Sequence, residues 1–183
     1  MRPARDCHFV LTGAPGAGKT TLIRALRQRG LACVDEVARR VIQVQRELRG
    51  HDLREVDPAL WVELVLQQDI ANFLAADPEV PTVFDRGIVD AVGVADASTP
   101  ATAHHRAAIT RFRYAPMVFV APPWEAIYHT DTERNQTPAE AIESHDRVCA
   151  AYAAAGYELI PLPLAAPETR ADFVLRRIGL PAG

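Results

Sequence analysis

Lysine is almost absent from this sequence, in which Lys19 is the only lysine among 20 basic residues. Arginine supplies every other basic side chain, so a lysine is expected to remain where a planar guanidinium cannot take its place. The scarcity also excludes the usual form of the Asn/Thr-Lys-x-Asp motif, with which GTP-binding switch proteins recognise guanine. Guanine recognition by other means stays open.

Long apolar runs, excess positive charge, cysteine and serine are also scarce. No apolar run approaches the roughly 20 residues that a membrane helix needs. The formal net charge of −3 offers no basic surface for nucleic acid. The three cysteines (Cys7, Cys33 and Cys149) are odd in number and far apart, which argues against disulfides and for a reducing compartment. The two serines, Ser98 and Ser144, lie outside any nucleophile elbow. We therefore expect a cytoplasmic protein without nucleic-acid or membrane partners.

The pattern of apolar residues predicts an α/β fold. A chain of 183 residues, 49% of them hydrophobic, is long enough for one domain over residues 1–183. Short, continuously apolar segments alternate with amphipathic ones, which is typical of a parallel sheet covered by helices on both faces. Strands are expected at residues 8–12, 31–34, 82–84, 117–120 and 158–162, and helices at 19–28, 37–48, 57–76, 88–97, 101–113, 137–155 and 168–178.

A complete phosphate-binding motif, G-x-x-x-x-G-K-[ST], lies between the first predicted strand and helix. It consists of Gly13, Ala14, Pro15, Gly16, Ala17, Gly18, Lys19 and Thr20. Its glycines let main-chain N–H groups converge on phosphate oxygens, and the following helix directs its positive dipole end at the same point. Lys19 is expected to reach the β- and γ-phosphates, and the Thr20 hydroxyl to bind Mg²⁺. We predict that these residues and Thr21 bind a nucleoside triphosphate. A motif this early leaves no room for a cleaved leader.

Charged residues follow the second and third predicted strands. The second strand is followed by Asp35, Glu36 and Arg39, and the third ends in Asp85 and Arg86. The carboxyl ends of parallel strands meet at one edge, so these groups are expected to face one crevice suited to phosphoryl transfer. Asp85 occupies a Walker B position and is predicted to hold Mg²⁺ through water. The alternatives are that Asp35 or Glu36 caps the next helix and that Arg39 is a solvated charge.

A polar segment at about residues 124–137 lies where small-molecule kinases carry a mobile lid. Its Arg134 is predicted to close over the phosphates, the alternative being an ordinary surface charge. Trp124 either stacks on a substrate ring or anchors the loop to the core. His145 and Cys149 are four residues apart on one predicted helix, but two ligands without a partner pair make structural zinc improbable.

In order along the chain, these motifs resemble a bacterial family of predicted AAA-type ATPases. That family is related to the ribosylnicotinamide-kinase domain of NAD-salvage proteins and, more distantly, to thymidylate and deoxynucleoside kinases. The resemblance covers nearly the whole chain and implies a three-layer P-loop fold with sheet order 2-3-1-4-5, Mg–ATP binding and phosphoryl transfer. It also places Glu36 as a general base and Arg86 as the arginine after the strand-three acid. It rests on residues 12–22, 36–39, 84–87, 122–124, 127–128, 130–131, 133–134, 136–137 and 156–157.

The sequence therefore predicts an ATP-dependent kinase that moves the γ-phosphoryl group of Mg–ATP to a hydroxyl of a small, nucleoside-like acceptor. Lys19 and Arg134 would neutralise the transferring charge, and Glu36 would take the acceptor proton. Glu36, Arg39 and Arg86 would contact the acceptor. A ring-forming motor is disfavoured because Arg86 stands where such motors carry a glutamate. The alternative is a regulatory ATPase or GTPase that acts on a protein partner. The acceptor and the oligomeric state stay open.

Overall fold

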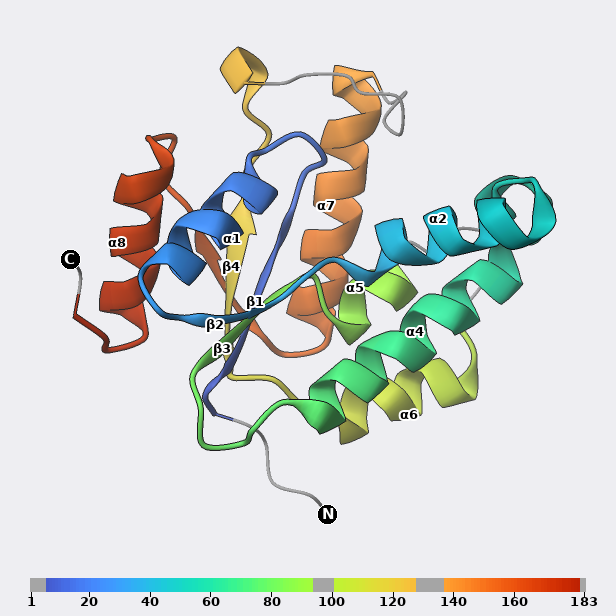
Figure 1. Cartoon of the computed structure of the whole chain (residues 1–183), viewed down its shortest axis with the longest axis horizontal. Coiled ribbons are helices and arrows are strands. Elements are labelled where there is room, and N and C mark those ends of the chain that lie inside the picture. Colours follow the sequence, from blue (N-terminus) through green and yellow to red (C-terminus); the bar gives the residue numbers. More distant parts are fainter. Residues whose placement is uncertain (1–5, 94–100, 128–136, 182–183) are drawn as a thin grey trace.

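The computed structural model describes residues 6–93, 101–127 and 137–181. Its central feature is a parallel five-stranded sheet in the order β2-β3-β1-β4-β5 with helices on both sides (Figure 1). Both the α/β class and the order of the sheet confirm the prediction. The strands are β1 (His8–Gly13), β2 (Ala32–Val34), β3 (Thr82–Asp85), β4 (Met117–Ala121) and β5 (Glu158–Pro161), each within one residue of its predicted ends.

The helices begin and end at residues whose chemistry marked those positions in the sequence. Asp57 accepts a hydrogen bond from the N–H of Leu60 at the start of α4, and Thr137 forms a capping box at the start of α7. Gly50 ends α2 in the left-handed conformation. The helices are α1 (Lys19–Gln28), α2 (Val37–Arg49), α3 (Leu53–Val56), α4 (Pro58–Ala75), α5 (Ile88–Gly93), α6 (Ala103–Arg111), α7 (Pro138–Ala154) and α8 (Pro167–Arg177), with a 3-10 turn η1 (Glu125–Ile127).

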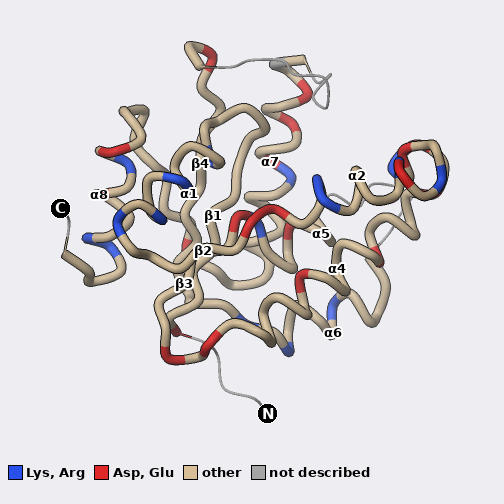
Figure 2. The backbone as a smooth tube through the Cα atoms, in the orientation of Figure 1, with Lys and Arg blue, Asp and Glu red and all other residues tan. Residues whose placement is uncertain are grey.

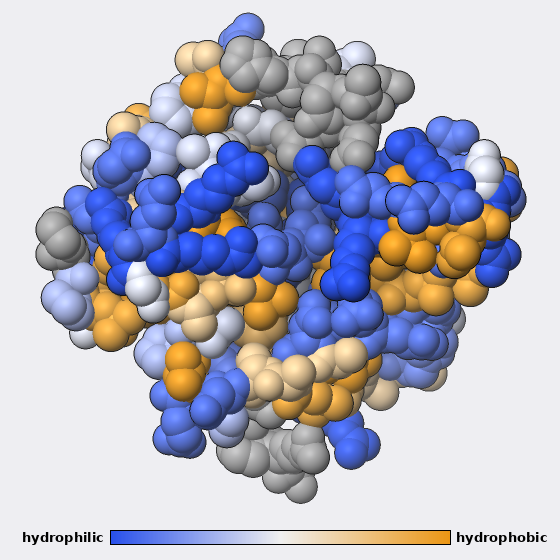
Figure 3. Space-filling view, viewed as in Figure 1, coloured by the Kyte–Doolittle hydropathy of each residue, from blue (hydrophilic) through white to orange (hydrophobic). Residues whose placement is uncertain are grey.

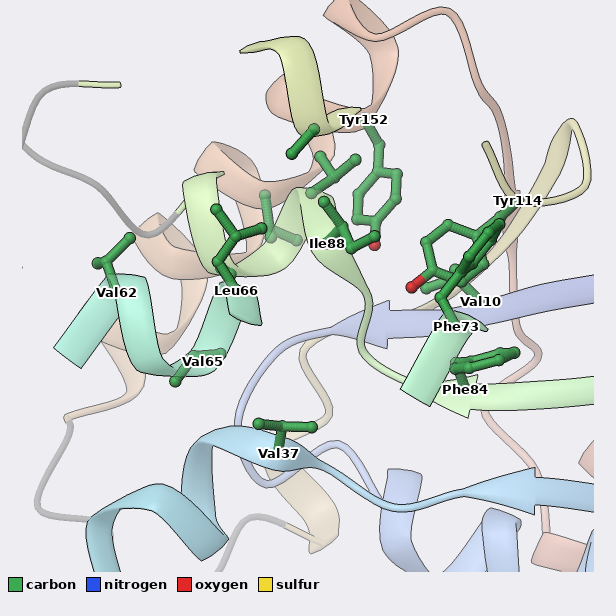
Figure 4. Close-up of a cluster of buried hydrophobic side chains, with 14 of the residues drawn as sticks. Val10, Val37, Val62, Val65, Leu66, Phe73, Phe84, Ile88, Tyr114 and Tyr152 are labelled. Atoms are coloured by element: carbon green, nitrogen blue, oxygen red, sulfur yellow. The ribbon is translucent and has the colours of Figure 1, made fainter. Parts of the chain in front are cut away.

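Each face of the sheet buries its own apolar core. Successive residues of β1 alternate between them, so Val10 packs with the helices on one face and Leu11 with those on the other. The helices α1 and α8 cover the Leu11 face, while α2, α4, α5, α6 and α7 cover the Val10 face. Figure 4 shows the core on the Val10 face, where the Tyr114 ring packs against Phe73 of α4 and against Phe84 of β3. The helices α1 and α2 begin at the carboxyl edge of the sheet, directly after β1 and β2 (Figure 1).

One helix differs from the predicted elements. The helix α3 was missed, although Asp52 caps it by accepting from the N–H of Arg54 and also pairs with Arg46. The described part of α5 ends at Gly93, and residues 94–97 of the predicted helix lie outside the described residues. His105 is buried because it completes the capping box that Thr102 forms at the start of α6.

Within the described residues, no helix is both long enough and apolar enough to cross a lipid bilayer.

Candidate active site

The phosphate-binding loop joins β1 to α1 and is anchored on β4. The N–H of Ala14 donates to the carbonyl oxygen of Ala121 at 3.1 Å. Gly13 has a φ of 119°, and a Cβ added there would lie 2.1 Å from the Ala121 oxygen. Only glycine fits this close approach, so β4 sets where the loop begins. The loop ends at Gly18, the N-cap of α1, which leaves the first-turn N–H groups directed at the loop.

Lys19 lies folded against the loop that it follows. Its Nζ donates to the carbonyl oxygens of Gly13 at 3.2 Å and Ala14 at 2.8 Å, and the side chain is buried. Burial lowers the pKa of Lys19 to about 7, with a further lowering by the positive charge of Arg86. The carboxylates of Asp85, Glu36 and Asp90 act in the opposite direction, and bound phosphate would add a further anion beside this buried ammonium group. Thr20 follows with an exposed side chain at the start of α1, as a metal-binding hydroxyl requires.

Asp85 ends β3 next to the phosphate-binding loop. Its register partner in β1 is Leu11, and the following N–H, of Arg86, donates to the Leu11 carbonyl oxygen at 2.9 Å. The side chain is buried, and its Oδ1 has no hydrogen-bond partner in the part of the chain that the structure describes. Burial raises the pKa of Asp85 to about 6, although the positive charge of Lys19 acts in the opposite direction. An unpartnered carboxylate oxygen at this position suits a hard divalent cation.

Glu36 and Arg86 form an ion pair across the ends of β2 and β3. The Arg86 Nε donates to Glu36 Oε1 at 2.9 Å. Burial favours protonation of Glu36, but the charges of Arg86 and Lys19 outweigh it and lower the pKa of this carboxyl. Arg86 has a φ of 71°, a left-handed conformation that is unusual for an arginine. The turn after β3 is therefore held in a special conformation that directs Arg86 towards Glu36. Figure 2 shows charged residues close together where β2 and β3 end.

Asp90, which the sequence analysis missed, holds this turn in place. Its Oδ1 accepts from Thr12 Oγ1 and from Arg86 Nη1 at 3.1 Å. Its Oδ2 accepts from the N–H of Gly87 at 2.9 Å and from the Tyr152 hydroxyl at 2.6 Å. One buried carboxylate thus joins β1, the turn after β3, and helices α5 and α7. The only local signal was its position four residues after Arg86.

The other predicted site residues take different positions. Asp35 is exposed and pairs with Arg27 at 2.9 Å, so it faces away from the loop. The capping alternative is wrong for Glu36, which occupies the N-cap of α2 without a side-chain cap hydrogen bond. Arg39 is half-buried, and its charge also lowers the pKa of Glu36. Arg134 lies outside the described residues, as does most of the predicted lid. Figure 3 shows a recess between α1 and α2 at this edge of the sheet.

Two further groups of side chains that include histidines offer metal-ligand atoms. Ligand atoms of Glu63, His104 and His105 lie within 4.8 Å of one another. However, His105 Nδ1 accepts from the N–H of Thr102 at 3.1 Å, so the ring proton lies on Nε2, which contacts Glu63 Oε1 at 2.7 Å. This nitrogen has no lone pair for a metal, and the cluster is a hydrogen-bonded one. His145 Nε2 lies 3.7 Å from the Cys149 sulfur, and the described residues add no third ligand there.

Comparisons with solved structures identify the fold. The YorR protein of Bacillus subtilis, solved with phosphorylated GDP, superimposes with a TM-score of 0.59 at 9% identity, covering 93% of this chain and 95% of YorR. Shikimate kinase from Acinetobacter baumannii, solved with shikimate, superimposes with a TM-score of 0.51 at 17% identity. The superposition covers 93% of this chain and 92% of that kinase. Deoxyadenosine kinase from M. mycoides, solved with dATP, superimposes with a TM-score of 0.51 at 11% identity. The superposition covers 93% of this chain and 98% of that kinase. These likenesses show a three-layer α/β P-loop fold.

Sequence comparisons identify the family. A nucleotide-binding protein of Anaeromyxobacter dehalogenans strain 2CP-C is 37% identical over 71 residues, which are 39% of this chain. This chain aligns with only 23% of the length of that relative, and the same share of a relative from Anaeromyxobacter strain K. A family model described as an AAA domain matches residues 8–170, from the first residue of β1 to the first half of α8. The chain therefore belongs to this AAA-domain family of nucleotide-binding P-loop proteins.

Proposed function

We propose that this protein is a small-molecule kinase that transfers the γ-phosphoryl group of a magnesium-bound nucleoside triphosphate to a hydroxyl. The observation that carries the proposal is the Glu36–Arg86 ion pair at the same strand edge as buried Lys19. A phosphate-binding loop alone binds a nucleotide, whereas an ionised carboxylate beside it can also accept a proton from an acceptor. ATP is the donor that the sequence predicts.

The donor would be held by the loop from Gly13 to Thr20. Main-chain N–H groups and the Lys19 ammonium group would contact phosphate oxygens, and Thr21 would lie at the same helix end. The Thr20 hydroxyl and, through water, Asp85 would hold Mg²⁺, and the unpartnered Oδ1 of Asp85 supports this assignment. When bound, Mg²⁺ neutralises charge on the phosphate oxygens.

The transfer itself requires one bond to form and one to break. The acceptor oxygen bonds to the γ-phosphorus while the bond from that phosphorus to the bridging oxygen breaks, and the nucleoside diphosphate leaves. The acceptor proton passes to Glu36, which the charges of Arg86 and Lys19 keep ionised. Arg86 positions this carboxylate, and Arg39 and Arg134 would contact the acceptor and the transferring phosphoryl group respectively.

The acceptor would lie between α2, α4 and α5. Asp69 of α4 is buried there among the charges of Asp90, Glu36 and Arg86. Burial, together with the negative charges of Asp90 and Glu36, raises the pKa of Asp69 well above its usual value, which favours the protonated form, and a protonated Asp69 would donate a hydrogen bond. A small polar acceptor fits such surroundings better than a large protein segment.

A turnover screen tests this function. Nucleosides and vitamins that carry hydroxyl groups are incubated with the full chain and Mg²⁺, with ATP and with GTP, and the diphosphate and the phosphorylated product are both quantified. With the best acceptor, Glu36→Gln should lower turnover by about 100-fold or more, a size typical of a general base, while nucleotide affinity is retained. The matched control Glu47→Gln, on the exposed face of α2, should behave as the unmodified protein does. Diphosphate formation that needs no acceptor would instead support a regulatory nucleotidase, and unchanged turnover in Glu36→Gln would remove Glu36 from this role.

A further inference from the structure

An arginine that is only partly hydrogen-bonded within the described residues lies against the phosphate-binding loop, outside the residues assigned above. Arg170, in the first half of α8, is 2% exposed, and its Nη1 donates to the carbonyl oxygen of Ala17 at 2.8 Å. Its Nε and Nη2 are buried, and neither has a hydrogen-bond partner among the described residues. Leaving two donors of a buried cation unpaired is costly, which indicates that this edge of the guanidinium binds a ligand.

The position of Arg170 excludes the phosphates as that ligand. In the P-loop, the N–H of Gly18 points into the phosphate cavity. The peptide that joins Ala17 to Gly18 is trans, so the Ala17 carbonyl points the opposite way, out of the cavity. Because Arg170 contacts this carbonyl, its side chain lies on the outer side of the loop. A Cβ added to Gly18 would lie 3.0 Å from Arg170 Nη1 and 3.1 Å from Ile127 Cδ1, which places both side chains beside the start of α1.

An aromatic ring lies next to this arginine. The Cζ of Arg170 is 6.0 Å from the centre of the Trp124 ring, and Trp124 is partly exposed. Trp124 lies between β4 and η1, so β4, η1 and α8 bring the ring and the guanidinium together at the carboxyl edge of the sheet (Figure 1). Ligands of open α/β sheets bind outside the carboxyl ends of the strands, so the ribose and base of a nucleotide whose triphosphate fills the loop would lie at this edge. A stacking surface and a pair of N–H donors at that point suit a base.

The two unpartnered nitrogens determine which base fits. The Nε–H and one Nη2–H lie on the same edge of the guanidinium and point in parallel, so they match two adjacent acceptors. Guanine presents O6 and N7 as such a pair, whereas adenine presents N7 beside an amino group that is itself a donor. Adenine would place an N–H group against one of the two donors of Arg170.

We propose that Arg170 and Trp124 bind the base of the nucleotide and that this site favours guanine over adenine. The inference rests on the proposed nucleotide site, but it is independent of the acceptor and of the transfer step. GTP would then be the better donor, and Arg170 would recognise its guanine in place of the guanine motif that the sequence lacks.

Calorimetry on the full chain with Mg²⁺ tests the proposal. The probes are the β,γ-imido analogues of GTP and ATP, and tripolyphosphate, which has no base. The unmodified protein should bind the guanine analogue about 10-fold or more tightly than the adenine analogue, as one bidentate arginine contact implies. In Arg170→Gln this ratio should fall to about two-fold or less, with tripolyphosphate affinity unchanged. The matched control Arg176→Gln, on the exposed end of α8, should keep the full ratio.

Three outcomes would overturn the inference. The first is an unmodified protein that binds the adenine analogue as tightly as the guanine analogue. The second is an Arg170→Gln variant that weakens all three probes by the same factor, which would make Arg170 a support of the loop only. The third is a protein that binds none of the probes, in which case the proposed function fails as well. Should Arg170→Gln not fold, 7-deazaguanosine triphosphate, which lacks the N7 acceptor, tests the same contact in the unmodified protein and should bind more weakly than GTP.

Discussion

Replacing Asp90 by asparagine should destabilise the turn that carries Arg86. Each carboxylate oxygen of Asp90 accepts two hydrogen bonds, Oδ1 from Thr12 and Arg86 and Oδ2 from Gly87 and Tyr152. Asparagine has the same shape but offers one oxygen and one amino group. The hydroxyls of Thr12 and Tyr152 can rotate to accept from that amino group. The guanidinium of Arg86 and the N–H of Gly87 cannot, so either orientation of the amide leaves one of them facing another donor.

The expected cost follows from these contacts. A buried donor left unsatisfied costs about 1–3 kcal/mol, and removing one partner of a buried ion pair costs about 3–5 kcal/mol. Because Glu36 still pairs with Arg86 in the variant, we expect a loss at the point where the two ranges meet, about 3 kcal/mol. For a chain of 183 residues that corresponds to a fall in Tm of about 6–12 °C.

Thermal unfolding of Asp90→Asn, read by circular dichroism, measures this loss, with Asp146→Asn on the exposed face of α7 as the matched control. Tyr152→Phe removes one donor and leaves the carboxylate with three others, so it should cost only about 1 kcal/mol. In the double variant the two losses should be less than additive, because the residues share one hydrogen bond. A Tm for Asp90→Asn within about 1 °C of the unmodified protein would refute the reasoning, since it corresponds to less than about 0.5 kcal/mol.

Three further predictions concern the loop and a buried acid. Gly13→Ala should lower the free energy of unfolding by about 3 kcal/mol or more and abolish nucleotide binding, because its Cβ would lie 2.1 Å from the Ala121 oxygen. Urea unfolding measures the stability and calorimetry measures the binding. A variant that is stable and binds nucleotide would contradict the role of this close approach. Lys19→Ala should weaken both nucleotide binding and turnover, and full activity would refute the proposed function. Asp69→Asn should raise the Tm at neutral pH. Burial raises the pKa of Asp69 in the folded state above its unfolded value, so its stabilisation is complete below the unfolded pKa and is lost as pH rises through the folded one. The Tm difference between the variant and the unmodified protein should therefore grow from pH 4 to pH 8, and a constant difference would contradict the raised pKa.

The local parts of the fold were readable from the sequence. Helix ends at Gly50, Asp57 and Thr137 were predicted because a cap or a left-handed glycine acts through hydrogen bonds within a few residues. The helix α3 was missed because its stabilising contacts come from Asp52 side-chain pairs with Arg46 and Arg54 rather than from an apolar period.

The candidate site was predictable only in part. Pattern placed Asp35 and Glu36 together after β2, but it could not tell which of them turns towards the loop. That choice depends on Arg27, which holds Asp35 outward, and on Arg86, which holds Glu36 inward across a separation of 50 residues.

By itself, the sequence determined the phosphate-binding loop, the parallel sheet and the strand ends at which charged groups gather. Each of these follows from consecutive residues or from a short period, because main-chain conformation and amphipathic burial are local properties. Only the tertiary structure decided that Asp90 joins Thr12 across 78 residues and that Arg170 reaches Ala17 across 153. A hydrogen bond between distant residues requires the whole sheet and its helices to be in place, so no local sequence pattern predicts it.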